Sequence, residues 1–462
     1  MVLNRWSTIA FAAAGLLVLL GSAGYLTARF NSADRSVFLP AATTHGHYQI
    51  ELACSACHDV GNGVKEQACI DCHGAELKAA NDSHPMAKFT DPRNADRLQL
   101  IRADRCITCH REHQPALTRA MGVTMPQDYC YHCHVQTLTD RPSHKEFAFD
   151  SCATAGCHNY HDNTALYESF LVKHGAEPDM KSPAARPTRN LREALLAGRP
   201  KLIQPALDAD AADAPAPVSP GILSEWHSTA HARAGVNCSD CHLLATKNGS
   251  GKEWQERPGH AACAACHRAE TAGFLAGHHG MRLAQDLGPM TPAMARLPMR
   301  DEAAHAELTC SSCHGAHEFD TRTAAVDACV KCHDDEHTRN YAASPHAALW
   351  QAELAGRAPP GSGVSCATCH LPRETQRDGD VIRVLVQHNQ NNNLRPNEKM
   401  IRSVCHDCHG LGFAIDALAD PALIRKNFNG RPATHVESID LALRRQLENK
   451  KPTTKPNTEN EP

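Results

Sequence analysis

All 22 cysteines of this 462-residue chain occur in pairs, and a histidine directly follows the second cysteine of every pair. The eleventh pair is stretched to Cys152-Ala-Thr-Ala-Gly-Cys157-His158, whereas the others have the spacing Cys-x-x-Cys-His. No cysteine is left over for another purpose. The ten regular motifs are Cys54/Cys57/His58, Cys69/Cys72/His73, Cys106/Cys109/His110, Cys130/Cys133/His134, Cys238/Cys241/His242, Cys263/Cys266/His267, Cys310/Cys313/His314, Cys329/Cys332/His333, Cys366/Cys369/His370 and Cys405/Cys408/His409.

The spacing of these motifs matches one kind of cofactor chemistry. Two thiols at this distance form thioether bonds to the vinyl groups of a haem, and the histidine that follows is an axial iron ligand. A disulfide framework does not explain the histidine after each pair, and zinc sites need two pairs per metal and no particular next residue. The pattern therefore predicts eleven covalently bound haems c, with the stretched motif counted as one site.

The amount of chain between the motifs limits the fold class. Between His45 and His435, about 36 residues are present for each motif. This is too little chain for an ordinary apolar core, so the porphyrins must form the core. An aromatic content of 5% and a mean hydropathy of −0.43 fit this interpretation. The sequence predicts a mainly α protein with much irregular chain and little β structure, wrapped around a stack of haems.

The N-terminus contains a charge-free apolar run of 18 residues from Ile9 to Leu26, preceded by Arg5. Its length is at the short end for a transmembrane helix. The small residues Gly21-Ser22-Ala23 also resemble a signal-peptide cleavage site, so both interpretations stay open, with an uncleaved anchor preferred. In either case the rest of the chain is exported, which predicts a periplasmic location and tethering to the cytoplasmic membrane.

The motifs fall into two groups, separated by a stretch that is rich in proline and alanine and contains no cysteine or histidine. Each group has its own surplus of histidines, so we expect fragments 40–176 and 222–440 to acquire their haems separately. The predicted organisation is an anchor or signal at 1–30, a five-haem lobe at 45–174, a linker at 177–220 with a short helix at 191–197, a six-haem lobe at 222–435, and a helix with a polar tail at 436–462.

Eighteen histidines lie outside the motifs and their Cys-to-Cys loops, enough for a second axial ligand at every iron. Four of them follow a motif histidine by three or four residues, a helical spacing that turns a side chain away from its own iron and toward a neighbour's. A surface or packing role is the alternative for any single one. Because imidazoles are in surplus, we expect bis-histidine ligation and low reduction potentials. The predicted second ligands are His84, His113, His144, His161, His174, His231, His278, His317, His337, His346 and His388.

Residues 222–435 contain recurring segments, such as Ser228-Thr-Ala-His231 before one motif and Ser344-Pro-His346 before another. This part resembles the superfamily of pentahaem nitrite reductases, hydroxylamine oxidoreductase and octahaem tetrathionate reductases. The first lobe looks more like small periplasmic electron-carrier cytochromes. The catalytic devices of the superfamily are not carried over, because no motif ends in lysine and the last tyrosine, Tyr341, precedes the last two motifs.

The formal charge of −4 becomes roughly −15 once haem propionates and ferric irons are counted. This argues against nucleic acid as a partner and favours redox partner proteins with basic patches. We expect electron transfer between a membrane-side donor, such as quinol-oxidising components of the inner membrane, and a periplasmic acceptor, with no catalytic residue. The alternative is an oxidoreductase of the hydroxylamine, nitrite or tetrathionate class, with an open iron near His278-His279, Arg339 and Tyr341.

Overall fold

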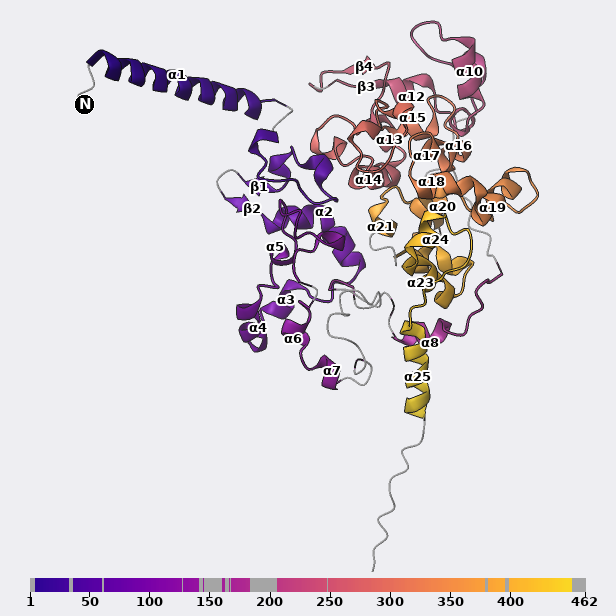
Figure 1. The fold of residues 1–462 in the computed structure, drawn as a ribbon. Helices are drawn as coiled ribbons and strands as arrows, with labels where there is room; N and C mark the ends of the chain where they lie inside the picture. The colour runs from indigo at the N-terminus through magenta and orange to yellow at the C-terminus, as the bar shows by residue number, and fades with distance from the viewer. Residues whose placement is uncertain are drawn as a thin grey trace, which may run out of the picture. The chain divides into compact units, whose positions relative to one another are not determined.

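The computed structural model describes residues 5–32, 36–59, 62–126, 128–140, 144, 160–162, 166, 168–182, 206–246, 248–378, 381–394 and 399–450 (Figure 1). The stretched motif Cys152–His158, the helix predicted at 191–197 and the tail beyond residue 450 lie outside these residues. Short helices joined by irregular chain dominate the described part, and strands form only small hairpins there. The predicted fold class, mainly α with little β structure, is confirmed.

The chain divides into two compact units, and the first comprises residues 1–71 and 105–125. Its helices are short apart from the N-terminal one, and its two strands pair as an antiparallel hairpin. Its elements are α1 (Arg5–Phe30), the 3-10 helices η1 (Ser36–Phe38), η2 (Tyr48–Ile50) and η3 (Cys54–Ala56), β1 (His58–Asp59), β2 (Gly63–Val64), the start of α2 (Glu66–Ala79), α5 (Cys106–Cys109) and η5 (Ala120–Gly122).

The second unit comprises residues 72–104 and 126–462. Its strands form two antiparallel hairpins, β3 (Leu243–Ala245) with β4 (Lys252–Trp254) and β5 (Arg373–Asp378) with β6 (Val381–Val386). Its helices, after the end of α2, are α3 (Met86–Phe89), η4 (Pro92–Asn94), α4 (Ala95–Leu100), α6 (Tyr131–His134), α7 (Thr137–Asp140), α8 (Glu168–His174), η9 (Ala209–Ala211), α10 (Pro220–His227), α11 (Ala230–Arg233), α12 (Cys238–His242), α13 (His260–Ala264), α14 (Arg268–Ala276), η10 (Leu283–Gln285), η11 (Pro292–Met294), η12 (Asp301–Ala303), α15 (Cys310–His314), α16 (Thr321–Ala325), α17 (Asp327–Val330), α18 (Glu336–Asn340), η13 (Tyr341–Ala343), α19 (Pro345–Leu354), α20 (Cys366–His370), α21 (Asn391–Leu394), α22 (Lys399–Ser403), η14 (Cys405–Asp407), α23 (Leu411–Ala419), α24 (Pro421–Arg425) and α25 (Ser438–Lys450).

The boundary between the units differs from the boundary between the two predicted lobes. It passes through the second haem motif, so that Cys69 belongs to the first unit and Cys72 to the second. Residues 72–104 and 126–174, which the sequence assigns to the five-haem lobe, are part of the second unit. Packing between distant segments sets this division, and sequence spacing does not reveal such packing. The two-lobe organisation therefore stays a prediction.

Helix α1 is long and apolar enough to cross a membrane. Its apolar part, Ile9–Phe30, has 22 residues and a mean hydropathy of 2.0, and none of it is buried against the rest of the protein. A helix with an exposed, all-round apolar surface needs an apolar solvent. The helix can therefore serve as a membrane anchor or as a signal sequence.

Three motif helices of the second unit begin at a polar residue that directly precedes the first cysteine: Asn237 for α12, Thr309 for α15 and Ser365 for α20. In each case this side chain caps the helix, and the residue before the second cysteine bonds back to the backbone N–H of the capping residue. Asp240, for example, accepts a hydrogen bond of 2.8 Å from the Asn237 N–H. This reciprocal capping box satisfies donors at the helix start. These three motifs thus fold locally into one helical turn that ends in the histidine.

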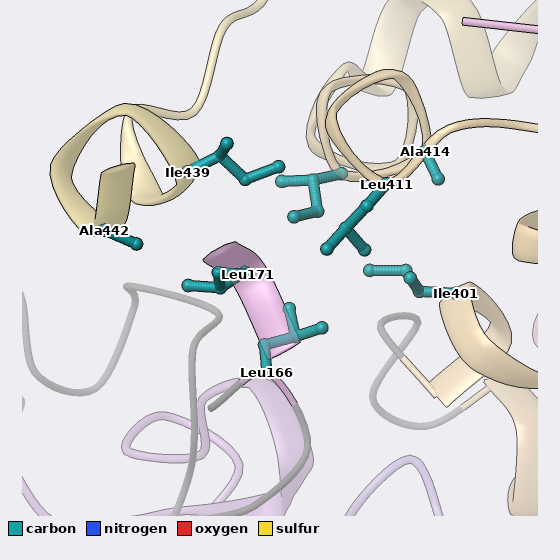
Figure 2. Close-up of a cluster of buried hydrophobic side chains, with 8 residues drawn as sticks. Leu166, Leu171, Ile401, Leu411, Ala414, Ile439 and Ala442 are labelled. Carbon is teal, nitrogen blue, oxygen red and sulfur yellow. The ribbon is translucent and has the colours of Figure 1, made fainter. Parts of the chain in front are cut away.

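An apolar core of the second unit surrounds the last motif (Figure 2). Side chains of α22 and α23, which flank this motif, pack against α25. They also pack against Leu166, just before α8, and Leu171, within it. Residues 166–174 are therefore integrated with the C-terminal part of the chain. The buried members of the cluster are Leu166, Leu171, Ile401, Leu411, Ala414, Ile415, Ile439 and Ala442.

Replacing Leu411 by alanine should lower the free energy of unfolding by about 2–5 kcal/mol, because the side chain is fully buried and its loss leaves a cavity. The measurement is denaturant or thermal unfolding of the haem-loaded protein. Leu447→Ala, on the same core-forming helix α25 but 65% exposed, is the control and should change stability little. Equal effects of the two substitutions would contradict the described packing.

His435 is a pH-dependent link between α23 and α25. Its Nδ1 lies 2.9 Å from Asp416 and its Nε2 lies 2.6 Å from Asp440, and these two hydrogen bonds raise the pKa of His435 to about 9. Because the folded pKa exceeds the unfolded value near 6.5, the stabilisation should be complete below pH 6.5 and lost as the pH rises through 9. Melting temperatures of the wild type and His435→Gln should therefore differ at pH 6, converge above pH 9, and differ less in high salt, since the site is exposed.

Candidate haem sites

The described residues include eight pairs of histidines whose ring centroids lie at a nearly constant distance from each other. These are called the facing pairs below. Each pair joins a motif histidine to a histidine from elsewhere in the same unit, and the ring centroids are 6.0–6.4 Å apart. The pairs, with the motif histidine first, are His58/His113, His134/His84, His242/His317, His267/His231, His314/His388, His333/His279, His370/His337 and His409/His346.

This gap fits one metal atom between two imidazoles. Two metal–nitrogen bonds of about 2 Å, plus roughly 1 Å from each nitrogen to its ring centre, place the two centroids about 6 Å apart. Centroid distances of 6.0–6.1 Å also occur between other rings, such as Phe30/Phe38 and His337/Phe428. The feature that distinguishes the eight pairs is that each joins a motif histidine to a second histidine at this distance. The eight pairs therefore have the geometry of axial ligands on opposite sides of a haem iron.

Hydrogen bonds at the second ring nitrogen orient several of these histidines. Nδ1 donates to a backbone carbonyl in His113 (to Ala41, 2.7 Å), in His242 (to Gln255, 2.7 Å) and in His388 (to Val386, 2.8 Å). A metal-bound imidazole commonly donates its other N–H in this way, which fixes the tautomer and leaves Nε2 for the metal. The same arrangement occurs in His84 with Tyr160, His337 with Ile424 and His409 with Asp179.

Burial favours the neutral form of six of the paired imidazoles. It lowers the pKa of His279 and of His370 to about 4, with a smaller contribution from neighbouring histidines. Neutral imidazole is the form that coordinates a metal. Burial is likewise the main cause that lowers the pKa of His84, His317, His333 and His409.

Four of the facing pairs share one continuous cavity in the second unit. Its volume is about 2890 Å³, roughly three times the upper end for a pocket that holds one small ligand. The cavity is therefore large enough for several cofactors side by side. The paired histidines that line it are His242, His317, His267, His231, His314, His388, His333 and His279.

Hairpins and strained turns place the facing rings. Strand β4 returns Trp254 to stack on His242 at 4.9 Å, and strand β6 leads the chain to His388. His113 and His317 have left-handed backbone torsions, with φ of 60° and 67°. Such torsions are uncommon for residues other than glycine and often mark functional sites. The three-residue spacing in these two motifs is therefore a tight turn, and the helical spacing expected from the sequence is wrong there.

The last six motifs, from Cys238 to His409, follow one another in space as they do in sequence. The Cys263 thiol is hydrogen-bonded to Cys310 of the next motif, and the Cys329 thiol to Cys366. Attachment points this close require neighbouring haems. In the first unit, Cys69 and Cys106 contact each other in the same way.

The other neighbouring motifs in this row also have thiols close to one another, since a thiol of one motif raises the pKa of a thiol in its neighbour. The pKa of Cys241 and of Cys313 is raised to about 11 and that of Cys405 to about 12, mainly by burial and to a smaller extent by a thiol of an adjacent motif. The six motifs from 238 to 408 thus form one row in chain order. The adjacent thiols are Cys263 for Cys241, Cys329 for Cys313 and Cys369 for Cys405.

The second cysteines of the first two motifs, Cys57 and Cys72, differ from the common arrangement that the shared spacing predicts. Cys57 follows η3 with a φ of −120°, and its carbonyl accepts a hydrogen bond of 3.3 Å from the Lys65 N–H, so its motif is not a complete α-helical turn. Cys72 is exposed and lies inside the longer helix α2. The flanking chain sets these two backbones differently, which identical spacing does not reveal. Cys408 has a setting similar to that of Cys57, since it follows η14 with a φ of −126°. These differences do not separate one site from another, and haem attachment at each motif stays a prediction from the sequence.

Seven of the eleven predicted second ligands belong to the facing pairs, and the other four do not face a motif histidine among the described contacts. His279, and not His278, faces His333. His161 lies 3.2 Å from Asp82, and His174 lies beside Glu177 and His406. Half-buried His144 is flanked by residues that the structure does not describe. For His144 and His161, axial ligation stays a prediction.

Two described motif histidines, His73 and His110, do not belong to a facing pair. His73 lies 3.3 Å from Glu76, and His110 lies 3.4 Å from the Gly122 carbonyl. His158 of the stretched motif lies outside the described residues. For these three sites the second axial ligand stays a prediction from the sequence.

The side chains considered for an open iron are engaged elsewhere. The Tyr341 hydroxyl is buried and donates to the Val364 carbonyl at 2.8 Å. Arg339 pairs with Asp334. His279 is one of the facing rings.

Sequence reasoning missed the residues that orient the ligands. Backbone carbonyls such as Ala41 and Ile424 carry no side-chain signal. Gln390 contacts His279 Nδ1 at 3.0 Å through its amide, whose other atom, Oε1, is buried without a hydrogen-bond partner. Turning the amide would let Oε1 accept from the Nδ1–H, as a metal ligand requires. In the sequence, only the doublet His278-His279 pointed to a ligand opposite His333. It did not show which of the two histidines is the ligand.

Attachment motifs, facing histidines and a helical scaffold with little strand define a multihaem c-type cytochrome. Residues 46–135, about a fifth of the chain, match the family described as cytochrome c3. No curated protein matches the chain. The family is one of covalently bound haem and electron transfer, and these properties apply to the matched segment. The resemblance of residues 222–435 to the nitrite reductase and hydroxylamine oxidoreductase superfamily stays a prediction.

Proposed function

We propose that this chain is an eleven-haem electron-transfer protein that carries electrons between a donor at the cytoplasmic membrane and an acceptor in the periplasm. The observation that carries the proposal is the set of eight facing histidine pairs. With a nitrogen available on both sides of each site, no coordination position is left for a substrate there. Haem c bound at these sites supplies one-electron oxidation and reduction.

The row of six motifs in the second unit supports transfer over a distance. Cysteines of successive attachment loops contact each other, and four of the facing pairs line one shared cavity. An apolar N-terminal helix fits a donor in the membrane, for which quinol-oxidising components are the proposed partner class.

The test combines two measurements on the oxidised protein. A pyridine haemochrome assay should give eleven haems per chain, and electron paramagnetic resonance should show low-spin ferric haems only. A count of ten would leave the stretched motif empty. A high-spin signal with a substrate-sensitive line shape would instead support the alternative, an oxidoreductase of small nitrogen or sulfur compounds.

The anchor makes a separate prediction. The protein should stay in the membrane fraction after washing with high salt, and mass spectrometry should find Arg5 in the mature chain, because an apolar helix of 22 residues partitions into the bilayer. Release into the soluble periplasm with a new terminus near Gly24 would show that the helix is a removed signal.

A further inference from the structure

Three potential metal ligands converge beside the last haem motif. His174 Nδ1 lies 2.7 Å from one carboxylate oxygen of Glu177, and His406 Nε2 lies 2.7 Å from the other. The nitrogen and oxygen atoms of the three side chains all lie within 4.8 Å of one another. The side chains are only 15–23% exposed. Two imidazole nitrogens and one carboxylate form a ligand set that suits first-row transition metals.

Rigid elements hold all three side chains. His174 ends α8, which Leu171 anchors in the apolar core, and the Glu177 N–H bonds back to the His174 carbonyl at 3.3 Å. His406 lies between Cys405 and Cys408, so two thioether bonds fix its backbone once haem is attached. Such preorganisation lowers the cost of gathering ligands around an ion.

The surroundings close one side of the cluster and keep the Glu177 carboxylate ionised. The Phe170 ring packs 4.5 Å from His174 and 5.9 Å from His406. Burial raises the pKa of Glu177, but hydrogen bonds from His174 and His406 more than offset this and lower it to about 2. Lys181 Nζ lies 3.7 Å from the carboxylate and is the charge that an incoming cation must displace.

We propose that His174, Glu177 and His406 bind a divalent first-row transition-metal ion, separate from the haem irons, on the attachment loop of the last haem. A tetrahedral ion with metal–ligand bonds of about 2.0–2.2 Å places its ligand atoms roughly 3.3–3.6 Å apart, so the two contacts of 2.7 Å must lengthen by roughly 0.6–0.9 Å when the ion enters. Three protein ligands leave further positions on the ion for water or another small ligand. In this site His174 has a different role from the axial ligand predicted from the sequence.

An ion here would add positive charge next to one haem. That charge favours the reduced form, so the reduction potential of the last haem should rise when the ion binds. This effect does not depend on whether the protein is an electron carrier or an enzyme, so the inference is independent of the proposed function.

The experiment uses the full-length, haem-loaded protein after chelator treatment and removal of the chelator. Titration with Zn²⁺, followed by calorimetry, should show one tight equivalent. Glu177→Gln and His406→Gln should each weaken binding at least tenfold, which is about 1.4 kcal/mol. The matched control is His132→Gln, because His132 also lies inside a Cys-x-x-Cys loop but outside this cluster, and it should leave binding unchanged.

Potentiometric titration with and without Zn²⁺ gives the second readout, an upward shift of one haem in the wild type and no shift in Glu177→Gln. Haem content per chain shows that each variant has matured. Absence of tight Zn²⁺ binding would mean that the three side chains form a hydrogen-bonded clasp only. Equal binding by the wild type and the Glu177→Gln/His406→Gln double variant would place the ion elsewhere. Either result overturns the proposal.

Discussion

Replacing His317 by glycine should convert one haem of the second unit from low-spin to high-spin. The His317 ring faces His242 at a centroid distance of 6.0 Å, and no other described imidazole faces that side of the pair. Its φ of 67° lies in the region that glycine adopts without strain, so the backbone should keep its course when the side chain is removed. The variant separates ligand loss from misfolding better than a replacement at a helical position would.

Electron paramagnetic resonance and optical spectra of the oxidised variant should show one high-spin haem equivalent, with the other haems unchanged. Added imidazole should bind in the cavity and restore the low-spin spectrum. His317→Met, which offers a thioether in place of the imidazole, should keep the iron low-spin and raise its potential.

The control for this experiment repeats the backbone change without removing a ligand. Asp286 is exposed, also has a positive φ, of 53°, and faces no motif histidine among the described contacts. Asp286→Gly should therefore leave all spectra as in the wild type. If His317→Gly also retains the wild-type spectrum, the facing rings are not axial ligands and the interpretation of the eight pairs fails with them.

The attachment sites can be predicted from the sequence because their chemistry is local. The two thiols, the histidine and the cap before the first cysteine lie within one helical turn, as in the segment from Ser365 to His370. The fold class was predictable for a related reason, since eleven motifs in a short chain leave little room for anything except helices and loops around the cofactors. The same spacing does not fix the local backbone everywhere, as the different settings of Cys57 and Cys72 show.

The pairing of the rings was not predictable from the sequence, because it depends on contacts between distant segments. His388 meets His314 across 74 residues, and His84 meets His134 across 50. Nothing in the local sequence distinguishes His278 from His279, and the choice depends on Gln390, which is more than a hundred residues away. Spacing alone also misled at His113 and His317, where three residues form a left-handed turn and not a helix.

The residue at which the linker begins was also not predictable from the sequence. Residues 177–182 contain no cysteine or histidine, and their composition resembles the linker that follows. In the structure they pair with the last motif: the Lys181 N–H donates to the Cys408 carbonyl at 2.8 Å, and the Asp179 carbonyl accepts from His409 Nδ1 and from the Gly410 N–H. The backbone of this segment, whose hydrogen bonds no composition reveals, therefore orients a predicted haem ligand.

A fragment of residues 222–440 should consequently mature poorly, whereas a fragment of residues 166–450 should acquire six haems. Both contain the same six motifs, but only the longer one retains Leu166, Leu171 and most of α25. Burial of each of those two leucines contributes about 1.5–3 kcal/mol. The shorter fragment also loses the Asp179 carbonyl beside His409, so its last site should be the first to lose haem or to become high-spin.

The two fragments can be compared by haem content per chain, by spin state and by melting temperature after export with the maturation machinery. A third fragment, residues 166–450 with Leu171→Asp, keeps the length but places a charge in the apolar core, and it should behave like the short fragment. Equal haem content and equal melting temperatures for all three would show that residues 166–182 contribute nothing to the last site. Loss of haem confined to the last site in the two defective forms would instead establish that a segment preceding the linker completes the end of the row.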